Sequence, residues 1–414
     1  MPEFPAFAPR PHRAFSAGFY PSADFDFSVR YVLGAAPFGG ADVGEVLSTI
    51  DGVSNNDHDH WFQAWHDTGS RIRAAADAEA AAGHRVSASL AYLRAANYFA
   101  VAVNSVSGRK SDDLLVPTFR LHRSSWDGFV DTTDRIVERV AIPYEQDTLP
   151  GWFFRPDADG AARPTLVMVN GSDGAVSGLW SSGAAGALAR GYNVLVFDGP
   201  GQQSMLFERG VGFRPDWEVV LTPVVDFVLA RSDVDAGRLA LYGISQGGFW
   251  IGRALAYENR FAAAVADPGV VDVAASWSLN IPSSLMKLFR AGNRDAFDRD
   301  MALGLKFSPE AARTWKFRAR PYLQDGYFDT LTEVHRYTLT DDEAAQITTP
   351  LLVLDPEGEQ FWPGQSKELA DRAGGPTVLS PFTAAEGANF HCQPMARLLT
   401  DERMFGWLEG RLRR

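Results

Sequence analysis

From residue 138 onward the chain alternates short apolar runs with longer stretches of helical spacing. The segment "ERVAIPYEQDTLPGWFFRP" predicts two strands joined by a turn. Six further runs follow, at 165–170 (TLVMVN), 193–198 (NVLVFD), 238–242 (RLALY), 262–267 (AAAVAD), 350–355 (PLLVLD) and 376–380 (PTVLS). Short, nearly uninterrupted apolar runs are typical of parallel strands buried on both faces. Alternating with helices, they predict an α/β fold with a mostly parallel sheet flanked by helices.

Two segments do not fit this alternation. Residues 1–137 contain an alanine-rich stretch with apolar residues at helical spacing, interrupted near Gly83, and no strand-like pattern. They predict an N-terminal helical lid, with the sheet domain occupying 138–414. The interval from about 270 to 345 is too long for a simple connection and contains helical pieces. It predicts a helical insertion before the penultimate strand, lying over the site.

Composition narrows the choice of partners. The 414 residues are 46% hydrophobic and 22% charged, with a net charge of −12 and no run of Lys or Arg, which argues against nucleic acid and anionic membranes. With Cys392 as the single cysteine, no intramolecular disulfide can form. The N-terminus lacks the apolar core of an export signal, and no run approaches the ~20 apolar residues of a membrane-spanning helix. We therefore expect a cytoplasmic protein. The aromatic leader, which includes Phe4, Phe7, Phe15 and Phe25, is expected to pack either on a partner, as in a homodimer, or on the core of the chain.

The sequence Gly243-Ile244-Ser245-Gln246-Gly247 fits the pattern G-x-S-x-G between a predicted strand and a predicted helix. In this motif the serine occupies a strained strand-to-helix turn that presents its hydroxyl as a nucleophile. Taken alone, the pentapeptide could equally be a glycine-rich surface turn. The rest of the chain has to supply a base and an acid if Ser245 is a nucleophile.

A serine nucleophile needs a histidine base, which in turn needs an orienting carboxylate. In hydrolases built on such a sheet these residues follow in the order serine, acid, histidine. His391 is the one histidine beyond the last predicted strands, although a surface or helix-capping role would also fit it. The acid should follow the run 350–355. Glu359, a few residues into the loop, is favoured over Asp355, which ends the strand itself.

The loop after the third strand, "VMVNGSDGAVSG", is the expected second side of an acyl-transfer site. An oxyanion needs backbone donors, here predicted to be the N–H groups of Gln246 and of Ser172. Asp173 follows directly. Its carboxylate could bind a substrate group or manage a proton on the leaving group, and it could equally cap the next helix.

Two other stretches invite interpretations that we set aside. "NNDHDHW", at 55–61, gathers histidines and acids, but no further cluster completes a metal site and acids often precede a helix. "FDGPGQQS", at 197–204, lacks the spacing and the lysine of a phosphate loop, and predicts a turn at the rim of the site. We therefore predict no metal and no cofactor.

The motifs resemble the α/β-hydrolase superfamily over about 138–414. The whole chain is similar to a branch with an N-terminal helical lid that includes dihydroxypseudooxynicotine hydrolase, polyketide-shortening pigment hydrolases and proteins labelled dipeptidyl-peptidase-like. The stretches "GISQGG", "NGSDG", "FDGPGQ", "EGEQFWPGQ" and "FTAAEGANFHC" carry the resemblance. It implies a Ser245–His391–Glu359 triad, with Asp173 where the branch has an extra acid.

The resemblance also implies a reaction. Members of this branch cleave a carbon–carbon bond next to a ketone, so we expect hydrolysis of a β-dicarbonyl or aryl ketone, with a polyketide-like molecule as one candidate, in secondary metabolism. Ester, lactone or thioester hydrolysis, or acyl transfer, cyclisation or bond formation on the same triad, is the alternative. The expected partner is a small-molecule ketone or ester. Two positions differ from the usual pattern: the triad acid is Glu rather than Asp, and Asp173 is shorter than the glutamate of the nicotine-pathway enzyme.

Overall fold

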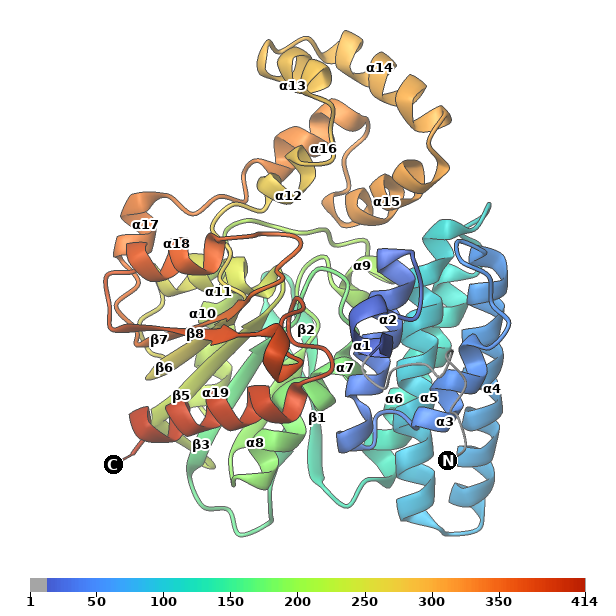
Figure 1. Ribbon diagram of the computed structural model, residues 1–414. Helices are drawn as coiled ribbons and strands as arrows, with labels where there is room; N and C mark the ends of the chain where they lie inside the picture. The colour runs from blue at the N-terminus through green and yellow to red at the C-terminus, as the bar shows by residue number, and fades with distance from the viewer. Residues whose placement is uncertain (1–12, 414) are drawn as a thin grey trace, which may run out of the picture.

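An eight-stranded sheet runs through the centre of the molecule, which is described here for residues 13–413 from a computed structural model (Figure 1). The strand order is β1-β2-β4-β3-β5-β6-β7-β8, antiparallel at β1–β2 and β2–β4 and parallel elsewhere. The strands are β1 (Ile136–Tyr144), β2 (Asp147–Arg155), β3 (Arg163–Val169), β4 (Asn193–Phe197), β5 (Val234–Ile244), β6 (Ala263–Asp267), β7 (Leu351–Pro356) and β8 (Thr377–Phe382). The predicted α/β fold with a mostly parallel sheet is confirmed.

Side chains of the central strands alternate between two hydrophobic cores, as the two-residue period of a strand requires. On β3, Leu166 and Met168 belong to one core, and Val167 and Val169 belong to the other. The first core is covered by α8 (Ala185–Ala189) and α19 (Arg397–Arg411), and the second by α10 (Glu218–Leu229), α11 (Gly247–Leu255) and α18 (Gln365–Arg372). Three short helical segments complete the body: α7 (Val176–Leu179), η3 (Trp180–Ala184) and α9 (Gln203–Phe207).

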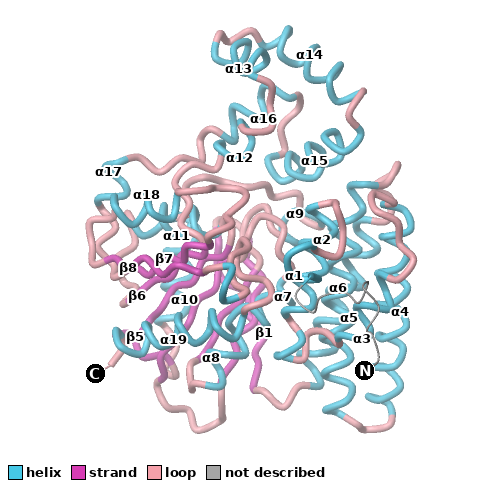
Figure 2. Tube along the Cα trace, in the orientation of Figure 1, coloured by secondary structure: helices cyan, strands magenta, loops and turns pink. Residues whose placement is uncertain are grey.

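The N-terminal part is helical, as predicted. It consists of α1 (Arg13–Ala17), α2 (Ala23–Gly34), η1 (Ala36–Phe38), α3 (Val43–Ile50), α4 (His58–Ala81), α5 (Arg85–Ser105), η2 (Val106–Gly108) and α6 (Leu115–Thr132). Figure 2 shows α4, α5 and α6 beside one another at one side of the sheet. Trp126 of α6 packs edge-on against Trp152 of β2, with ring centroids 5.8 Å apart, so one hydrophobic core runs from these helices into the sheet. The predicted domain boundary after residue 137 falls inside β1, and the division into two domains stays a prediction.

Aromatic residues of the leader pack within the chain where the structure describes them. Phe25 stacks on Trp61 of α4 with centroids 4.0 Å apart, and Phe15 meets Phe390 edge-on at 5.6 Å. Phe4 and Phe7 lie outside the described residues. The stretch Arg85–Gly108 is long and apolar enough to cross a membrane, but 72% of its apolar window is buried, as in a core helix.

The insertion between β6 and β7 forms a separate helical lobe above the carboxyl ends of the parallel strands (Figures 1 and 2). Its elements are α12 (Ala274–Ser278), α13 (Ser283–Arg290), α14 (Arg294–Lys306), α15 (Pro309–Ala319), η4 (Arg320–Tyr322) and α16 (Tyr327–Val334). The last helix of the insertion, α17 (Asp341–Ala345), lies beside α18 of the body (Figure 1). Outside the insertion, the short 3-10 helix η5 (Ala384–Glu386) follows β8. Ligands of open α/β sheets bind outside the carboxyl ends of the strands, so this lobe lies over the expected site.

One buried acid of the core gives a test of the packing. Asp401 of α19 is 2% exposed, and burial raises the pKa of its carboxyl to about 6, although Arg397 and Arg190 oppose the shift. Because the folded pKa exceeds the unfolded value, the Asp401 carboxyl should add a falling slope to the pH dependence of stability between about pH 4 and about pH 6, of up to about 3 kcal/mol. Asp401→Asn should remove this slope in urea unfolding measured from pH 4 to pH 8. The exposed neighbour supplies the control, because Glu402→Gln should retain the slope, and a retained slope in Asp401→Asn would contradict the assignment.

Candidate active site

The turn between β5 and α11 holds Ser245 in a left-handed conformation, with φ of 56°. This conformation is strained for a residue with a side chain, and such strain gathers at functional turns. The backbone N–H of Ser245 donates to the carbonyl of Asp267, at 2.6 Å. A Cβ on Gly247 would lie 2.8 Å from the Val169 carbonyl oxygen, and one on Gly243 would lie 2.5 Å from that of Gly247. Both glycines of the motif are therefore required by close backbone approach.

Three predicted residues from separate loops meet at this turn. Nε2 of His391 lies 2.8 Å from Oγ of Ser245, and its Nδ1 lies 2.7 Å from Oε2 of Glu359. The other carboxylate oxygen of Glu359 accepts the backbone N–H groups of Phe361 and Trp362, at 2.8 and 3.2 Å. This chain of contacts places Nδ1–H toward the carboxylate and leaves Nε2 to accept the Ser245 proton.

The alternative acid does not reach the histidine. Asp355 ends β7, and within residues 13–413 it forms no hydrogen bond to His391. Its pKa is raised by burial first and by the Glu359 charge second. Glu359 rather than Asp355 is the carboxylate in contact with the imidazole.

The electrostatics of the pair favour an ionised acid beside a basic imidazole. Burial would raise the pKa of Glu359, but the charge and hydrogen bond of His391, together with the two backbone N–H groups, outweigh it and lower that pKa. Burial opposes a charge on His391, yet the net pKa of His391 lies well above its usual value. The neighbouring Cys392 thiol, whose own pKa is raised to about 11 by burial, is neutral at pH 7, so Glu359 supplies the compensating charge.

The loop after β3 lies against the serine. A Cβ on Gly171 would be 2.8 Å from Cβ of Ser245, so only glycine allows this approach. Across residues 13–413, neither the backbone N–H of Ser172 nor that of Gln246 donates a hydrogen bond to another residue. Both predicted oxyanion donors are thus unengaged, and the loop that carries one of them touches the nucleophile.

Gln202 holds that loop in place and was missed in the sequence. Its Nε2 donates to the carbonyls of Asn170 and Gly171, at 2.8 and 3.2 Å, while its Oε1 accepts the Gly199 N–H at 2.8 Å. It belongs to the glycine-rich stretch 197–204, which lies at the rim of the site as expected. The available signal was an amide side chain inside a turn that follows a strand.

Asp173 does not cap a helix. The next helix, α7, has Ala175 at its N-cap and no side-chain cap. The carboxylate instead accepts only a long contact from the Ser172 hydroxyl, at 3.4 Å, while the Asp173 carbonyl receives the Asn104 side chain of α5 at 3.3 Å. Its side chain is exposed, but surrounding protein raises its pKa by desolvation, against the charges of Arg318 and His391. Asp173 therefore lies between the triad and the lobe.

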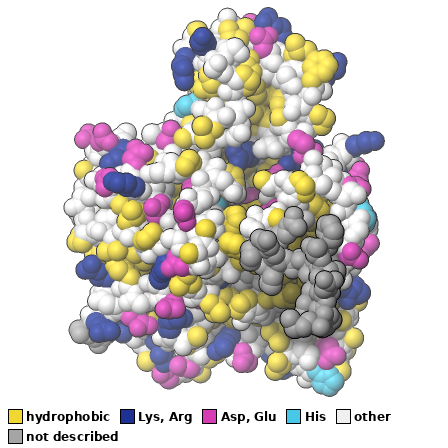
Figure 3. Space-filling view, in the orientation of Figure 1, with side chains coloured by type: hydrophobic (Ala, Val, Ile, Leu, Met, Phe, Trp, Pro, Cys, Tyr) yellow, Lys and Arg dark blue, Asp and Glu magenta, His cyan; other side chains and the backbone are white. Residues whose placement is uncertain are grey.

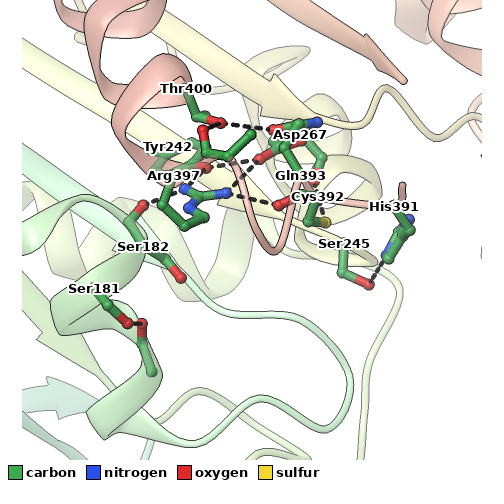
Figure 4. Close-up of polar contacts among 12 residues, drawn as sticks. Ser181, Ser182, Tyr242, Ser245, Asp267, His391, Cys392, Gln393, Arg397 and Thr400 are labelled. Atoms are coloured by element: carbon green, nitrogen blue, oxygen red, sulfur yellow. Dashed lines mark hydrogen bonds and ion pairs between the residues drawn. The ribbon is translucent and has the colours of Figure 1, made fainter. Parts of the chain in front are cut away.

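A buried polar network beneath the serine centres on Asp267, at the end of β6 (Figure 4). Its carboxylate accepts the Tyr242 hydroxyl at 2.8 Å and the Gln393 amide at 2.9 Å, and it pairs with Arg397 at 3.4 Å. Its carbonyl accepts the Ser245 N–H. One buried residue thus contacts the serine turn and the segment that follows His391.

Arg397 extends the network to a third segment. Its guanidinium donates to the carbonyls of Cys392 and Ser182, at 2.8 and 2.7 Å, and to the Tyr242 hydroxyl at 2.9 Å. The Cys392 thiol donates to the Asp267 carbonyl at 3.1 Å. Every member is buried. The distance between Ser245 and His391 is therefore fixed by hydrogen bonds that hold both of their loops.

The N-terminal helices close one side of the site. Arg30 of α2 lies over the ring of Phe390, 4.4 Å from its centroid, and Phe27 lies 6.3 Å from His391 between ring centroids. A Cβ on Gly34 would lie only 1.5 Å from the Pro394 carbonyl oxygen, which shows how closely α2 meets this loop. Figure 3 shows the surface hollowed between the lobe and the body, with basic and acidic side chains inside the hollow.

The histidine-rich stretch before α4 has contacts of its own. Asp57 is the N-cap and accepts the His60 N–H at 3.1 Å. Asp59 pairs with Arg109 at 2.9 Å, and His58 pairs with Glu310 of the lobe at 2.9 Å. These residues start a helix and join it to its neighbours.

The chain is similar to several known proteins. The prolyl oligopeptidase family model matches residues 184–299. "Hydrolase acrC" of Aspergillus aculeatus is 39% identical over 58% of this chain, and "20-hydroxy-prefusarin hydrolase FUS2" of Gibberella moniliformis is 34% identical over 66%. These matches span 60% and 65% of the relatives' own lengths, which is less than two thirds. "Alpha/beta hydrolase pydG" of an Acremonium species is 32% identical over 75% of this chain and 68% of its own length.

The solved structure of 2,6-dihydroxy-pseudo-oxynicotine hydrolase has the same fold, with a TM-score of 0.70 over 92% of this chain and 95% of that chain at 18% identity. That likeness includes the N-terminal helices, since it extends over nearly the whole chain. The resemblance seen in the sequence motifs is confirmed. From the relationship to pydG and the fold built around the G-I-S-Q-G turn, the chain belongs to the alpha/beta hydrolases.

Proposed function

We propose that this hydrolase cleaves a carbon–carbon bond next to a ketone, in a β-dicarbonyl or aryl ketone, through an acyl-enzyme on Ser245. The observation that carries the nucleophilic part is the contact chain from Ser245 Oγ to His391 Nε2, and from His391 Nδ1 to Glu359, at 2.8 and 2.7 Å. Asp173 beside the oxyanion loop supports the carbon–carbon part. The relative FUS2, named a 20-hydroxy-prefusarin hydrolase, makes a polyketide-like substrate the class to try first.

Acylation begins when His391 takes the Ser245 proton and Oγ attacks the ketone carbonyl. The resulting oxyanion is held by the backbone N–H groups of Gln246 and Ser172, and one such donor is typically worth about 3 kcal/mol. Glu359 orients the imidazole and stabilises its protonated form. The tetrahedral intermediate then collapses, its carbon–carbon bond breaks, and the acyl group stays on Ser245.

The electron pair of the broken bond must be accepted before the leaving carbon is protonated. It enters an adjacent carbonyl to give an enolate, or an electron-rich ring, and the protonated His391 then delivers its proton to that carbon. Water, activated by the again neutral His391, hydrolyses the acyl-enzyme and restores Ser245. An acid and the shortened ketone or arene are the products, and no oxidant or reductant is required.

Asp173 has the chemistry to assist the leaving group. Its pKa is raised by desolvation, so its carboxyl exchanges a proton closer to neutral pH than an ordinary aspartate does. Its neighbours are the charges of His391 on one side and Arg318 on the other. In this place it positions, through a hydrogen bond, the carbonyl or phenol that receives the electrons.

Hydrolysis of an ester, lactone or thioester, or acyl transfer on the same triad, is the second candidate. The complete Ser245–His391–Glu359 chain favours it, because an alkoxide or thiolate leaving group needs only His391 as its acid. The two candidates therefore differ in what they require of Asp173.

Asp173→Asn separates them. We expect cleavage of a β-diketone or aryl ketone to fall at least tenfold, about 1.4 kcal/mol of transition-state stabilisation, since the amide cannot exchange the proton. Hydrolysis of 4-nitrophenyl acetate should change much less. Both rates are measured on the same preparations, acid release by pH-stat and nitrophenolate by absorbance, with Ser245→Ala as the inactive control.

Equal losses on both substrates would show that Asp173 shapes the oxyanion loop instead. No loss on either would remove the structural support for carbon–carbon cleavage. Diketone turnover that survives in Ser245→Ala would overturn the proposal as a whole.

The triad makes a pH prediction. His391 accepts a proton only when neutral, and its pKa lies above 6.5, so kcat/KM should fall as pH decreases through a limb above pH 6.5. Glu359→Gln removes the charge that offsets burial, so the limb should move to lower pH while the rate drops by about 10⁴. The matched change Asp355→Asn should leave the limb in place. A limb unmoved in Glu359→Gln would contradict the role of Glu359.

A further inference from the structure

The lobe over the site carries a half-buried basic residue that has no ion-pair partner among residues 13–413. On α15 and the η4 turn after it, Arg313 pairs with Asp24 and with Glu310, and Lys316 and Arg320 both pair with Asp112, at 2.6 and 2.9 Å. These pairs lie three and four positions apart and join the lobe to the N-terminal helices. The basic side chains on this face of the helix are therefore all paired.

Arg318 lies on the same helix but outside that face. It is half-buried, and within residues 13–413 it forms no hydrogen bond and no ion pair. Its guanidinium carbon lies 5.3 Å from the centroid of the Phe361 ring. A cation that is partly removed from water and given no acceptor is costly unless something else pairs with it.

The position of Phe361 relates this cation to the reaction. The Phe361 ring meets His391 edge-on, with centroids 4.8 Å apart, and its backbone N–H is one of the two held by Glu359. Arg318 and the imidazole of His391 therefore contact the same aromatic ring. The guanidinium lies on the lobe over the site.

The acidic groups around Arg318 do not fully offset the loss of hydration of its positive charge. Desolvation lowers its pKa, although Asp24, Asp173 and Tyr322 act in the opposite direction. Asp24 is already paired with Arg313, and Asp173 influences Arg318 without an ion pair between them. Figure 3 shows basic and acidic side chains exposed together in the hollow between lobe and body.

We propose that Arg318 binds a carboxylate of the substrate, on a part remote from the bond that breaks. The inference rests on the proposed function and adds the substrate class: an anionic ketone or ester whose carboxylate pairs with the guanidinium while its carbonyl lies at Ser245. Arginine suits this role because its planar donors match a carboxylate bidentately.

The test uses matched activated esters that differ only in charge. Mono-4-nitrophenyl adipate, pimelate and suberate carry a carboxylate at three distances, each too far from the ester for ready closure to a five- or six-membered anhydride, and their methyl esters are the neutral partners. In the parent, kcat/KM for at least one acid should exceed that for its methyl ester. Arg318→Gln should reduce this ratio ten- to a hundredfold through KM, as expected for a charge-assisted contact made in ground and transition states alike. Arg318→Lys should restore part of it.

Two controls separate binding from folding and from catalysis. Arg299→Gln removes an exposed arginine from α14 of the same lobe and should leave the ratio unchanged. In the Ser245→Ala background, calorimetry should show the preferred acid binding at least tenfold more tightly than its methyl ester, and this preference should vanish in the double variant with Arg318→Gln. This readout remains valid even if the proposed chemistry is wrong.

Equal losses for acids and methyl esters in Arg318→Gln would show a structural role, and that result would overturn the proposal. So would a parent that prefers no acid over its methyl ester at any of the three lengths.

Discussion

The arrangement of this site depends on one buried residue, Asp267, through both its backbone carbonyl and its side-chain carboxylate. Its carbonyl fixes the backbone N–H of Ser245, and its side chain holds Tyr242, Gln393 and Arg397. Because it is fully buried, each of these contacts acts in a low-dielectric interior, where losing one partner costs far more than at the surface. The nucleophile and the histidine stand at the ends of two loops, and this network keeps both loops in register without contacting substrate.

The N-terminal helices and the lobe are two helical parts of the chain that lie outside the sheet and this network. The N-terminal helices share the core of the sheet, while the lobe of α12–α16 projects beyond the sheet and meets the N-terminal part through ion pairs of α15. Where these helical parts reduce the access of water, the electrostatic contact of Glu359 with His391 is strengthened. Arg318 belongs to this lobe and has no ion-pair partner among residues 13–413. In our proposal, the carboxylate of the substrate is that partner.

The sheet and the meeting of three residues could be predicted from the sequence because both depend on local signals. Short apolar runs marked the strands, G-I-S-Q-G marked the serine turn, and the order serine, acid, histidine selected Glu359 and His391 from a chain of eight histidines. The parts that could not be predicted depend on contacts between distant segments. Asp267 and Arg397 are 130 positions apart, and nothing in the composition around either one reveals the other.

Gln202 and Asp173 show the same limit at shorter range. Gln202 was visible only as part of a glycine-rich turn, and its function became clear from the two carbonyls that it binds. For Asp173 the sequence left a helix cap and a substrate contact equally open, and the start of α7 at Val176 with Ala175 as its N-cap removed the first. Arg318 carried no signal at all, because an arginine in a charged helix becomes unusual only when its neighbours are seen to be paired.

Labelling with a fluorophosphonate, followed by peptide mass spectrometry, tests the central claim most directly, since this reagent reacts only with a serine activated by its neighbours. The account predicts one adduct per chain, on the peptide that contains Ser245, with labelling abolished in Ser245→Ala and strongly slowed in Glu359→Gln. An adduct on another residue, or labelling that persists in Ser245→Ala, would contradict it.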